Sequence, residues 1–241
     1  MSANLRSSLS KTVILWDIDG TLLDTGGAGV VPFKSALEKH LKVKIEFDRS
    51  KLAGKTDYQI IDFFTQGTQS KKLSPLREYW LLRQYVLGLR KNLNAKTISV
   101  LGDSLLALNR ISTTHKWKLG ILTGNCSKGA KAKLGSAKLL NFFDQELIYC
   151  ASRKLRSREA ILRNAISRLK GNIVLIGDTP SDIVAAKSLS VSIISLASGA
   201  FDFCDLHSLN SGFVLDADWN YSQLKSKLEE LQNLIFIKNL D

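Results

Sequence analysis

Hydrophobic residues along the chain follow two spacings that alternate from one end to the other. Short, nearly continuous apolar runs such as VILW, LGIL and IVLI have the length and composition of strands that are buried on both faces. Longer stretches between them place apolar residues at helical spacing. This alternation predicts an α/β fold with a Rossmann-like parallel sheet built from strand–helix–strand units. Strands are expected at 13–18, 118–122, 146–149, 172–176, 191–196 and 212–215.

The region between the first two predicted strands, 19–117, is too long for a single connection. A crossover between parallel strands needs roughly a dozen residues or more. Helical patterns fill this region at 29–41, 56–66 and 74–93. The last begins with Ser74 and Pro75, which suit the N-cap and the first helical position. The domains expected are a helical cap, 24–98, inserted into a Rossmann-like catalytic core, 1–23 and 99–241.

Composition narrows the classes of function. The chain has 241 residues, 44% of them hydrophobic, and a formal net charge of +12. Its cations are spread along the chain, and no aromatic-rich RNA-binding motif accompanies them. The positive charge is therefore better explained by exposed helix faces than by nucleic-acid binding, and such a surface can also attract small anionic substrates. Three scattered cysteines and three scattered histidines argue against a zinc site or a disulfide framework. No apolar run is long enough for a signal or membrane segment, which predicts a cytoplasmic protein. We expect this protein to be a monomer or a homodimer.

Polar residues follow four of the predicted strands at the point where each strand ends. Ligands of open α/β sheets collect outside the carboxyl ends of the strands, so we expect these residues to meet. They are Asp17 and Asp19 after the first strand, Thr123, Gly124 and Asn125 after the second, the run SRKLRSR at 152–158 after the third, and Asp178 and Asp182 after the fourth. Gly20 and Thr21 form a turn behind the first pair of acids.

This set of residues has a coherent chemistry. Asp17 and Asp178 would bring carboxylates together at a hard divalent cation such as Mg²⁺, without which they would repel one another. Thr123 offers a hydroxyl, and the two residues after it offer backbone N–H groups, to a phosphoryl oxygen. A cation of the basic run would neutralise the remaining charge. A carboxylate nucleophile can form an aspartyl-phosphate, and Asp19 could protonate the leaving group and then activate water.

In this order the motifs resemble those of the haloacid dehalogenase superfamily, specifically its phosphoglycolate-phosphatase-like branch with an α-helical cap. The family patterns hhhhDxDGT, hhhT/SGN and GDxxxD stand here as VILWDIDGT, LGILTGN and VLIGDTPSD. The segment AGKTDYQII at 53–61 is similar to the cap segment that such members place over the substrate. The resemblance covers nearly the whole chain.

The resemblance implies a role for each matching residue. Asp17 would be the nucleophile and a Mg²⁺ ligand, and Asp19 the general acid/base and a ligand through its backbone carbonyl. Asp178 would bind the metal directly, and Asp182 would bind it through water or orient its other ligands. The positions implied for substrate binding are Gly20, Thr21, Gly54, Lys55, Thr56, Thr123, Gly124 and Asn125, of which Lys55 could equally be a surface lysine.

The third motif of the family, usually a Lys-Pro pair, is not matched. Instead four cations, Arg153, Lys154, Arg156 and Arg158, stand before the helical pattern EAILRNAISRL. Spacing to that helix favours Arg156 as the cation of the site, with Lys154 next, and leaves the others as surface charge.

The function expected is Mg²⁺-dependent hydrolysis of a small phosphomonoester through an aspartyl-phosphate. Phosphoglycolate, a nucleotide, pyrophosphate and a sugar phosphate are all open as the phosphorylated metabolite. The nearest alternative is a sugar-phosphate phosphomutase, which would return the phosphoryl group to substrate instead of water. A dehalogenase or a phosphonatase is disfavoured because neither needs an acid at Asp19, and a non-catalytic binding module would have no use for the intact acids.

Overall fold

The core of the protein is a six-stranded sheet in which every pair of neighbouring strands is parallel. The computed structural model describes residues 12–66, 73–94, 97–209 and 213–238. The strands are β1 Thr12–Trp16, β4 Trp117–Cys126, β5 Ile148–Ala151, β6 Ile173–Gly177, β7 Ser192–Leu196 and β8 Phe213–Leu215. Their order is β5-β4-β1-β6-β7-β8, so β1 lies between β4 and β6 and is buried along its whole length.

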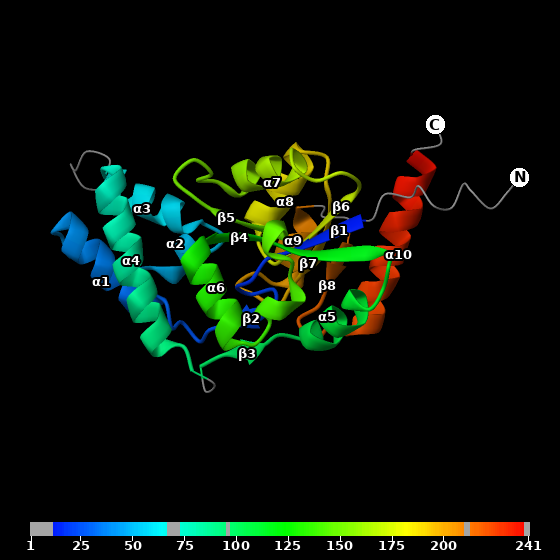
Figure 1. Cartoon of the computed structure of the whole chain (residues 1–241), viewed down its shortest axis with the longest axis horizontal. Coiled ribbons are helices and arrows are strands. Elements are labelled where there is room, and N and C mark those ends of the chain that lie inside the picture. The colour runs from blue at the N-terminus through cyan, green and yellow to red at the C-terminus, as the bar shows by residue number, and fades with distance from the viewer. Residues whose placement is uncertain (1–11, 67–72, 95–96, 210–212, 239–241) are drawn as a thin grey trace, which may run out of the picture.

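Helices cover both faces of this sheet (Figure 1). Because successive side chains of a strand point to opposite faces, Ile14 and Trp16 enter one apolar cluster while Val13 and Leu15 enter another. The first face is covered by α5 (Ser104–Ser112), α6 (Ser127–Ser136) and α10 (Tyr221–Lys238), and the second by α7 (Arg158–Ile166), α8 (Pro180–Ser188) and α9 (Phe203–Ser208). The core therefore has three layers, with the sheet in the middle.

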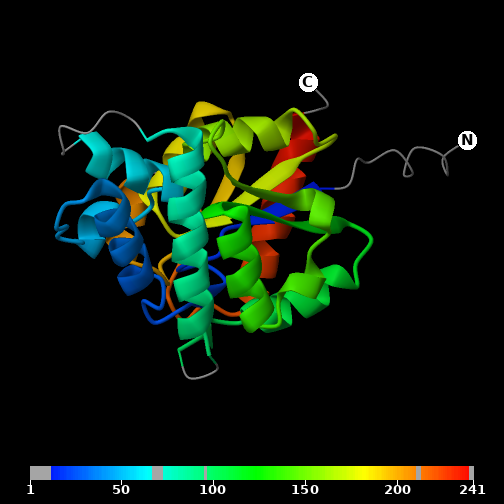
Figure 2. The same cartoon turned by 60° about the vertical axis from the view of Figure 1, so that its left-hand side comes forward.

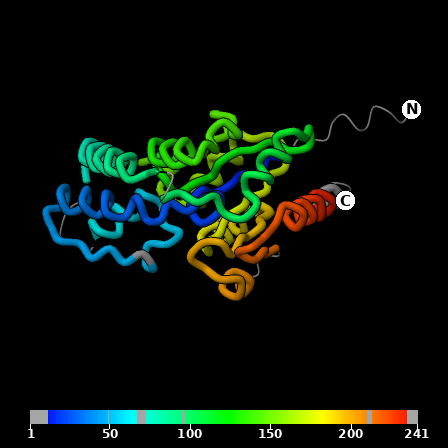
Figure 3. Tube along the Cα trace, turned by 90° about the horizontal axis from the view of Figure 1, so that it is seen from below, coloured from blue at the N-terminus to red at the C-terminus, as the bar shows by residue number. Residues whose placement is uncertain are grey.

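Four further helices, which we call the cap, lie together at one end of the core, away from α10 (Figure 3). They are α1 (Val30–Leu41), α2 (Arg49–Leu52), α3 (Asp57–Gln66) and α4 (Pro75–Asn92). Helix α4 begins where the sequence predicts, because the Ser74 side chain accepts a hydrogen bond from the Arg77 N–H and Pro75 occupies the first turn. The cap has its own apolar cluster, which includes Leu37 and Leu81.

The chain enters and leaves the cap at one place. The two-residue strand β2 (Leu23–Asp24) pairs antiparallel with β3 (Ser99–Val100), so that Leu23 lies opposite Val100 and Asp24 opposite Ser99. Helix α4 of the cap runs beside α6 of the core (Figure 2). The cap is thus a single insertion that packs back against the core.

The predicted α/β fold with a helical insertion is confirmed. All six predicted strands are present, although Gly212 of the last lies outside the described residues. Three of the predicted strands have bounds that differ by more than one residue. The first ends at Trp16 instead of 18, and β4 continues through the TGN segment to Cys126. The third runs from Ile148 to Ala151, because Glu146 lies in a 3-10 turn, Gln145–Leu147, that follows another at Leu140–Phe142. Helix α2, a single turn, was not predicted. In the described part of the chain, no helix combines the length and the apolar character needed to cross a membrane.

Candidate active site

Three carboxylates meet at the carboxyl ends of the two central strands. Asp17 follows β1, Asp178 follows β6, and Asp182 lies in the first turn of α8. Each offers an oxygen that lies within 4.8 Å of the others, and all three side chains are buried. The parallel register of β1 and β6, in which Trp16 pairs with Ile176, brings the first two acids to the same end of the sheet, one residue apart in level. Sequence reasoning predicted this meeting.

Two glycines leave the space that the Asp178 carboxylate fills. Gly20 has a φ of +76°, and a Cβ there would lie 2.1 Å from Asp178 Oδ2. A Cβ on Gly199 would lie 1.8 Å from the same oxygen. Thr21 then fixes the other oxygen, since its hydroxyl donates to Asp178 Oδ1 over 2.8 Å. Gly20 and Thr21 therefore build the acid cluster, and Gly199 is a contributor that the sequence did not reveal.

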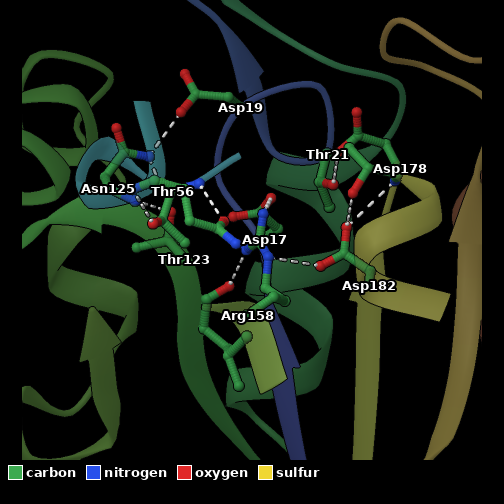
Figure 4. A network of polar contacts seen from close by, with 12 residues as sticks. Asp17, Asp19, Thr21, Thr56, Thr123, Asn125, Arg158, Asp178 and Asp182 are labelled. Carbon is green, nitrogen blue, oxygen red and sulfur yellow. Dashed lines mark hydrogen bonds and ion pairs between the residues drawn. The ribbon is translucent and has the colours of Figure 1, made fainter. Parts of the chain in front are cut away.

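Arg158 is the cation that faces the acids. It is the first residue of α7, whose N-cap, Ser157, accepts a hydrogen bond from the Ala160 N–H over 3.1 Å. Its Nη2 donates to Asp17 Oδ2 over 2.8 Å, and its Nε lies 3.1 Å from Asp182 Oδ1. Figure 4 shows the guanidinium between these two acids, with Asp178 and Thr21 beyond Asp182.

The sequence prediction that Arg156 or Lys154 faces the acids is therefore wrong. The Arg156 guanidinium turns to the cap, where it contacts Asp62 over 2.6 Å and Glu78 over 2.9 Å and lies over the ring of Tyr58. Lys154 is exposed. The reason is local: Arg156 lies in the loop before α7, whereas Arg158 starts the helix and its side chain is directed toward the strand ends.

The second acid of the DxD pair, Asp19, lies apart from Asp178 and Asp182, on the side of the site where Asn125 lies (Figure 4). Its carboxylate accepts a hydrogen bond from Asn125 Nδ2 over 2.6 Å and lies 2.7 Å from Lys133 Nζ. Asn125 Nδ2 also donates to Thr123 Oγ1 over 2.8 Å, so the end of β4 is tied to Asp19. Sequence reasoning missed Lys133. A signal was available, because the buried face of α6 is otherwise made of Gly129, Ala130 and Leu134.

The cap segment 53–61 closes over the strand ends. Thr56 is buried, and its hydroxyl donates to the Arg156 carbonyl. A Cβ on Gly124 would lie 3.1 Å from Thr56 Cα, and a Cβ on Gly54 would lie 2.9 Å from Ser181 Oγ, which shows how closely the segment approaches the core. Lys55 borders the cleft, but it is exposed and its Nζ lies 5.9 Å from the centre of the Phe63 ring.

A cleft of about 570 Å³ lies between this segment and the acids. Its floor is polar and belongs to the core, with Asp17, Asp19, Asp178, Thr123, Asn125, Lys133 and Arg158. Its cap wall is largely apolar, with Val30, Phe33, Phe47, Leu52, Ile60 and Tyr85. Such a shape suits a small ligand whose charged end faces the acids.

The acid cluster fits a divalent metal ion. Burial, followed by the charges of Asp17 and Asp182, raises the pKa of Asp178 well above its usual range. Burial also raises the pKa of Asp182 to about 6, although Arg158 opposes the change. Asp17 Oδ1 is buried and has no hydrogen-bond partner among the described residues. Buried carboxylates that are short of positive partners are what a hard, oxygen-preferring cation would stabilise.

Comparison with known proteins agrees with this geometry. Residues 14–196 match the model of the haloacid dehalogenase-like hydrolase family, and no curated protein matches the sequence. A predicted phosphatase from Clostridium acetobutylicum is 21% identical, with 92% of this chain and 100% of that chain covered and a TM-score of 0.67. A predicted phosphoglycolate phosphatase from Haemophilus somnus is 16% identical, with 92% and 99% covered and a TM-score of 0.65. The β-phosphoglucomutase of Clostridium difficile is 17% identical, with 92% and 98% covered and a TM-score of 0.68.

The fold and the carboxylate cluster define a capped α/β enzyme with its site at the ends of the central strands. Since the family match spans most of the chain, including all three acids of the cluster, the chain belongs to the haloacid dehalogenase-like hydrolases.

Proposed function

We propose that the protein is a Mg²⁺-dependent phosphomonoester hydrolase that works through an aspartyl-phosphate on Asp17. The observation that supports this most is the arrangement around Asp17: Oδ2 is bound by Arg158, Oδ1 is buried without a hydrogen-bond partner among the described residues, and the carboxylate belongs to the cluster with Asp178 and Asp182. An acid held in this way has one oxygen oriented by a cation and one available for bonding.

The reaction begins with attack of the Asp17 carboxylate on phosphorus, in line with the ester oxygen. A P–O bond to Asp17 forms as the bond to the ester oxygen breaks, and Asp19 gives its proton to that oxygen as the alcohol leaves. In the second step Asp19 takes a proton from water, which attacks phosphorus and releases phosphate from Asp17. Arg158, which contacts the attacking carboxylate, compensates the negative charge that develops on the phosphoryl oxygens.

A Mg²⁺ ion held by Asp17, Asp178 and, directly or through water, Asp182 would supply further positive charge to the phosphoryl group. The Asp19 backbone carbonyl is the fourth ligand that the family resemblance implies. At the end of β4 the Thr123 hydroxyl accepts hydrogen bonds from the Asn125 backbone N–H over 3.3 Å and from Asn125 Nδ2 over 2.8 Å, and it can donate its own proton to a phosphoryl oxygen. Each of these groups comes from the core, so the cap is free to determine which leaving group fits.

The cleft favours a small substrate, and most of its cap wall is apolar, although Ser50, Lys55, Asp57 and Tyr85 also line it. Phe33, Phe47 and Ile60 on the cap wall can enclose carbon but offer a sugar no hydrogen bonds. Among the described cations that border the cleft, Arg158 and Lys133 are already paired with acids. Lys55 is the remaining one, and it could bind a second anionic group of the substrate, such as the carboxylate of phosphoglycolate.

A phosphomutase is the second candidate, supported by the likeness of fold to a β-phosphoglucomutase. It would share every residue named for the first step and differ in the acceptor, since the phosphoryl group would return to a sugar hydroxyl. A nucleic-acid-binding role, suggested only by the net charge of +12, predicts affinity that falls steeply with salt and no turnover.

The test is a panel of phosphorylated metabolites, incubated with Mg²⁺ and analysed both for free phosphate and for isomerised sugar phosphate. We expect free phosphate, and its loss in Asp17→Asn. The matched control is Asp216→Asn, because Asp216 also follows a strand of the same sheet but is exposed and lies outside the cleft. Isomerisation without release of phosphate would support the mutase instead, and turnover that persists in Asp17→Asn would refute the nucleophile.

A further inference from the structure

The side chain of Lys133, in the last turn of α6, is buried in the core beside the site. The residue is 6% exposed, and its Nζ lies 2.8 Å from Asp19 Oδ1 and 2.7 Å from Asp19 Oδ2. The same nitrogen donates to Asn125 Oδ1 over 2.7 Å. Both carboxylate oxygens of Asp19 therefore face one ammonium group, and the amide of Asn125 closes the triangle by donating to Asp19 Oδ2.

Burying the charge of a lysine costs free energy unless the charge is paired, so the groups that pair with Lys133 indicate its role. Burial acts to lower the pKa of Lys133, but the nearby acids, first Asp19 and then Asp57 and Asp17, raise it overall. Asp57 comes from the cap, at the start of α3, and is itself fixed by accepting a hydrogen bond from the Cys126 N–H over 2.8 Å. The ammonium group therefore remains charged and faces acids from both the core and the cap.

We propose that Lys133 is a positioning residue that holds Asp19 as an oriented carboxylate, ready to act as the base of the second step. This inference rests on the proposed phosphatase function. When Asp19 has given its proton to the ester oxygen, the electron pair of the broken P–O bond remains on the leaving alcohol and the new carboxylate forms its ion pair with Lys133. The carboxylate is then oriented when the attacking water needs to lose a proton.

The inference distinguishes the two half-reactions. Formation of the aspartyl-phosphate needs Asp19 only as an acid, and an activated aryl ester needs that acid little because its leaving group is already stable as an anion. Hydrolysis of the aspartyl-phosphate needs Asp19 as an oriented base with every substrate. Loss of Lys133 should therefore slow the second step more than the first.

The experiment is rapid-mixing kinetics with p-nitrophenyl phosphate and saturating Mg²⁺, which separates the burst of nitrophenolate from steady-state turnover. In Lys133→Met we expect the burst rate to change less than about threefold, kcat to fall about 10- to 100-fold, and phosphorylated enzyme to accumulate. Lys133→Arg, which keeps the charge, should restore part of the loss. Lys131→Met, an exposed lysine of the same helix, should behave as wild type.

Three outcomes would overturn the proposal: unchanged kcat in Lys133→Met, equal slowing of both steps, or no recovery with Lys133→Arg. A double variant adds a sharper test, because Lys133→Met should change the second step less than about twofold when Asp19→Asn is already present. Lys133→Gln provides the same comparison if the methionine variant does not fold. If the wild-type protein releases no phosphate from any ester, the proposed function fails; if it turns over normally without these effects, only the role of Lys133 fails.

Discussion

Replacing Arg158 and Arg156 one at a time tests which cation of the basic run 152–158 compensates the charge of the acid cluster. Arg158 is 6% exposed and contacts Asp17 and Asp182, and its Nη1 also donates to the Leu122 carbonyl over 3.2 Å. Removing one partner of a buried ion pair costs about 3–5 kcal/mol of stability, because the other charge is left uncompensated. Loss of one group that stabilises transition-state charge lowers kcat by about 10²- to 10³-fold, or roughly 3–4 kcal/mol.

Arg158→Ala should therefore lose both activity and stability, whereas Arg156→Ala should lose mainly stability. The Arg156 side chain is 27% exposed, and its contacts are with Asp62 and Glu78 of the cap. Removing charged hydrogen bonds of this kind costs about 1–3 kcal/mol, and kcat should change less than about fivefold. Arg158→Lys should have a kcat and a stability between those of the wild type and Arg158→Ala, because an ammonium group keeps the charge but cannot span two carboxylates as a guanidinium does.

The assays are steady-state kinetics with saturating Mg²⁺ and urea unfolding of the same preparations. The comparison is well matched, since two residues of one type, two positions apart, are changed in the same way. A large loss of kcat in Arg156→Ala together with a small loss in Arg158→Ala would refute the assignment and restore the spacing argument that favoured Arg156.

Three further predictions concern the acid cluster and Asp19. In a chelating buffer the free energy of unfolding should fall as pH rises from about 4 to about 7, because Asp182 binds its proton more tightly in the folded chain (pKa about 6) than in the unfolded chain (3.8). Thermal melts should show that the melting temperature depends less on pH in Asp182→Asn, and that Mg²⁺ raises the melting temperature more at the higher pH. Gly199→Ala should weaken Mg²⁺ binding at least about tenfold by calorimetry, because its Cβ would displace the Asp178 carboxylate, and unchanged affinity would exclude Asp178 as a ligand. Asp19→Asn should slow turnover of alkyl phosphates by about 10²-fold or more while sparing the burst with p-nitrophenyl phosphate, and equal slowing of both would contradict its role as the acid.

The sequence was most informative where position along a strand decides position in space. Asp17 and Asp178 each follow a buried strand, and parallel neighbours end at the same edge, so their meeting could be predicted from the hydrophobic pattern alone. The insertion could be predicted in the same way, because its helices show their own apolar spacing and the segment is too long to be a single connection between two strands.

The third cation could not be predicted in this way. Arg156 and Arg158 are only two positions apart, and their directions depend on α7 starting at Arg158 and on the acids that the cap presents to Arg156. Lys133 was missed because a lysine on a helix is usually exposed; its place among the small and apolar residues of the buried face of α6 was a signal, but only the packing of α6 against the strand ends reveals its partner. Contacts between distant segments carry this information, and the local pattern does not.

The antiparallel pairing of β2 and β3 makes the cap modular. Residues that face each other in such a pair have Cα atoms about 5 Å apart, so Asp24 and Ser99 could be joined by a two-residue turn such as Asn-Gly to form a hairpin. Among the described residues of 24–98, only Tyr58 joins the two apolar clusters that flank the sheet, at the edge of one, so the shortened chain would keep them. A chain shortened in this way would keep the three acids and Arg158 but lose the apolar cap wall of the cleft, so the metal-binding part of the site and the part that encloses a ligand could be studied separately.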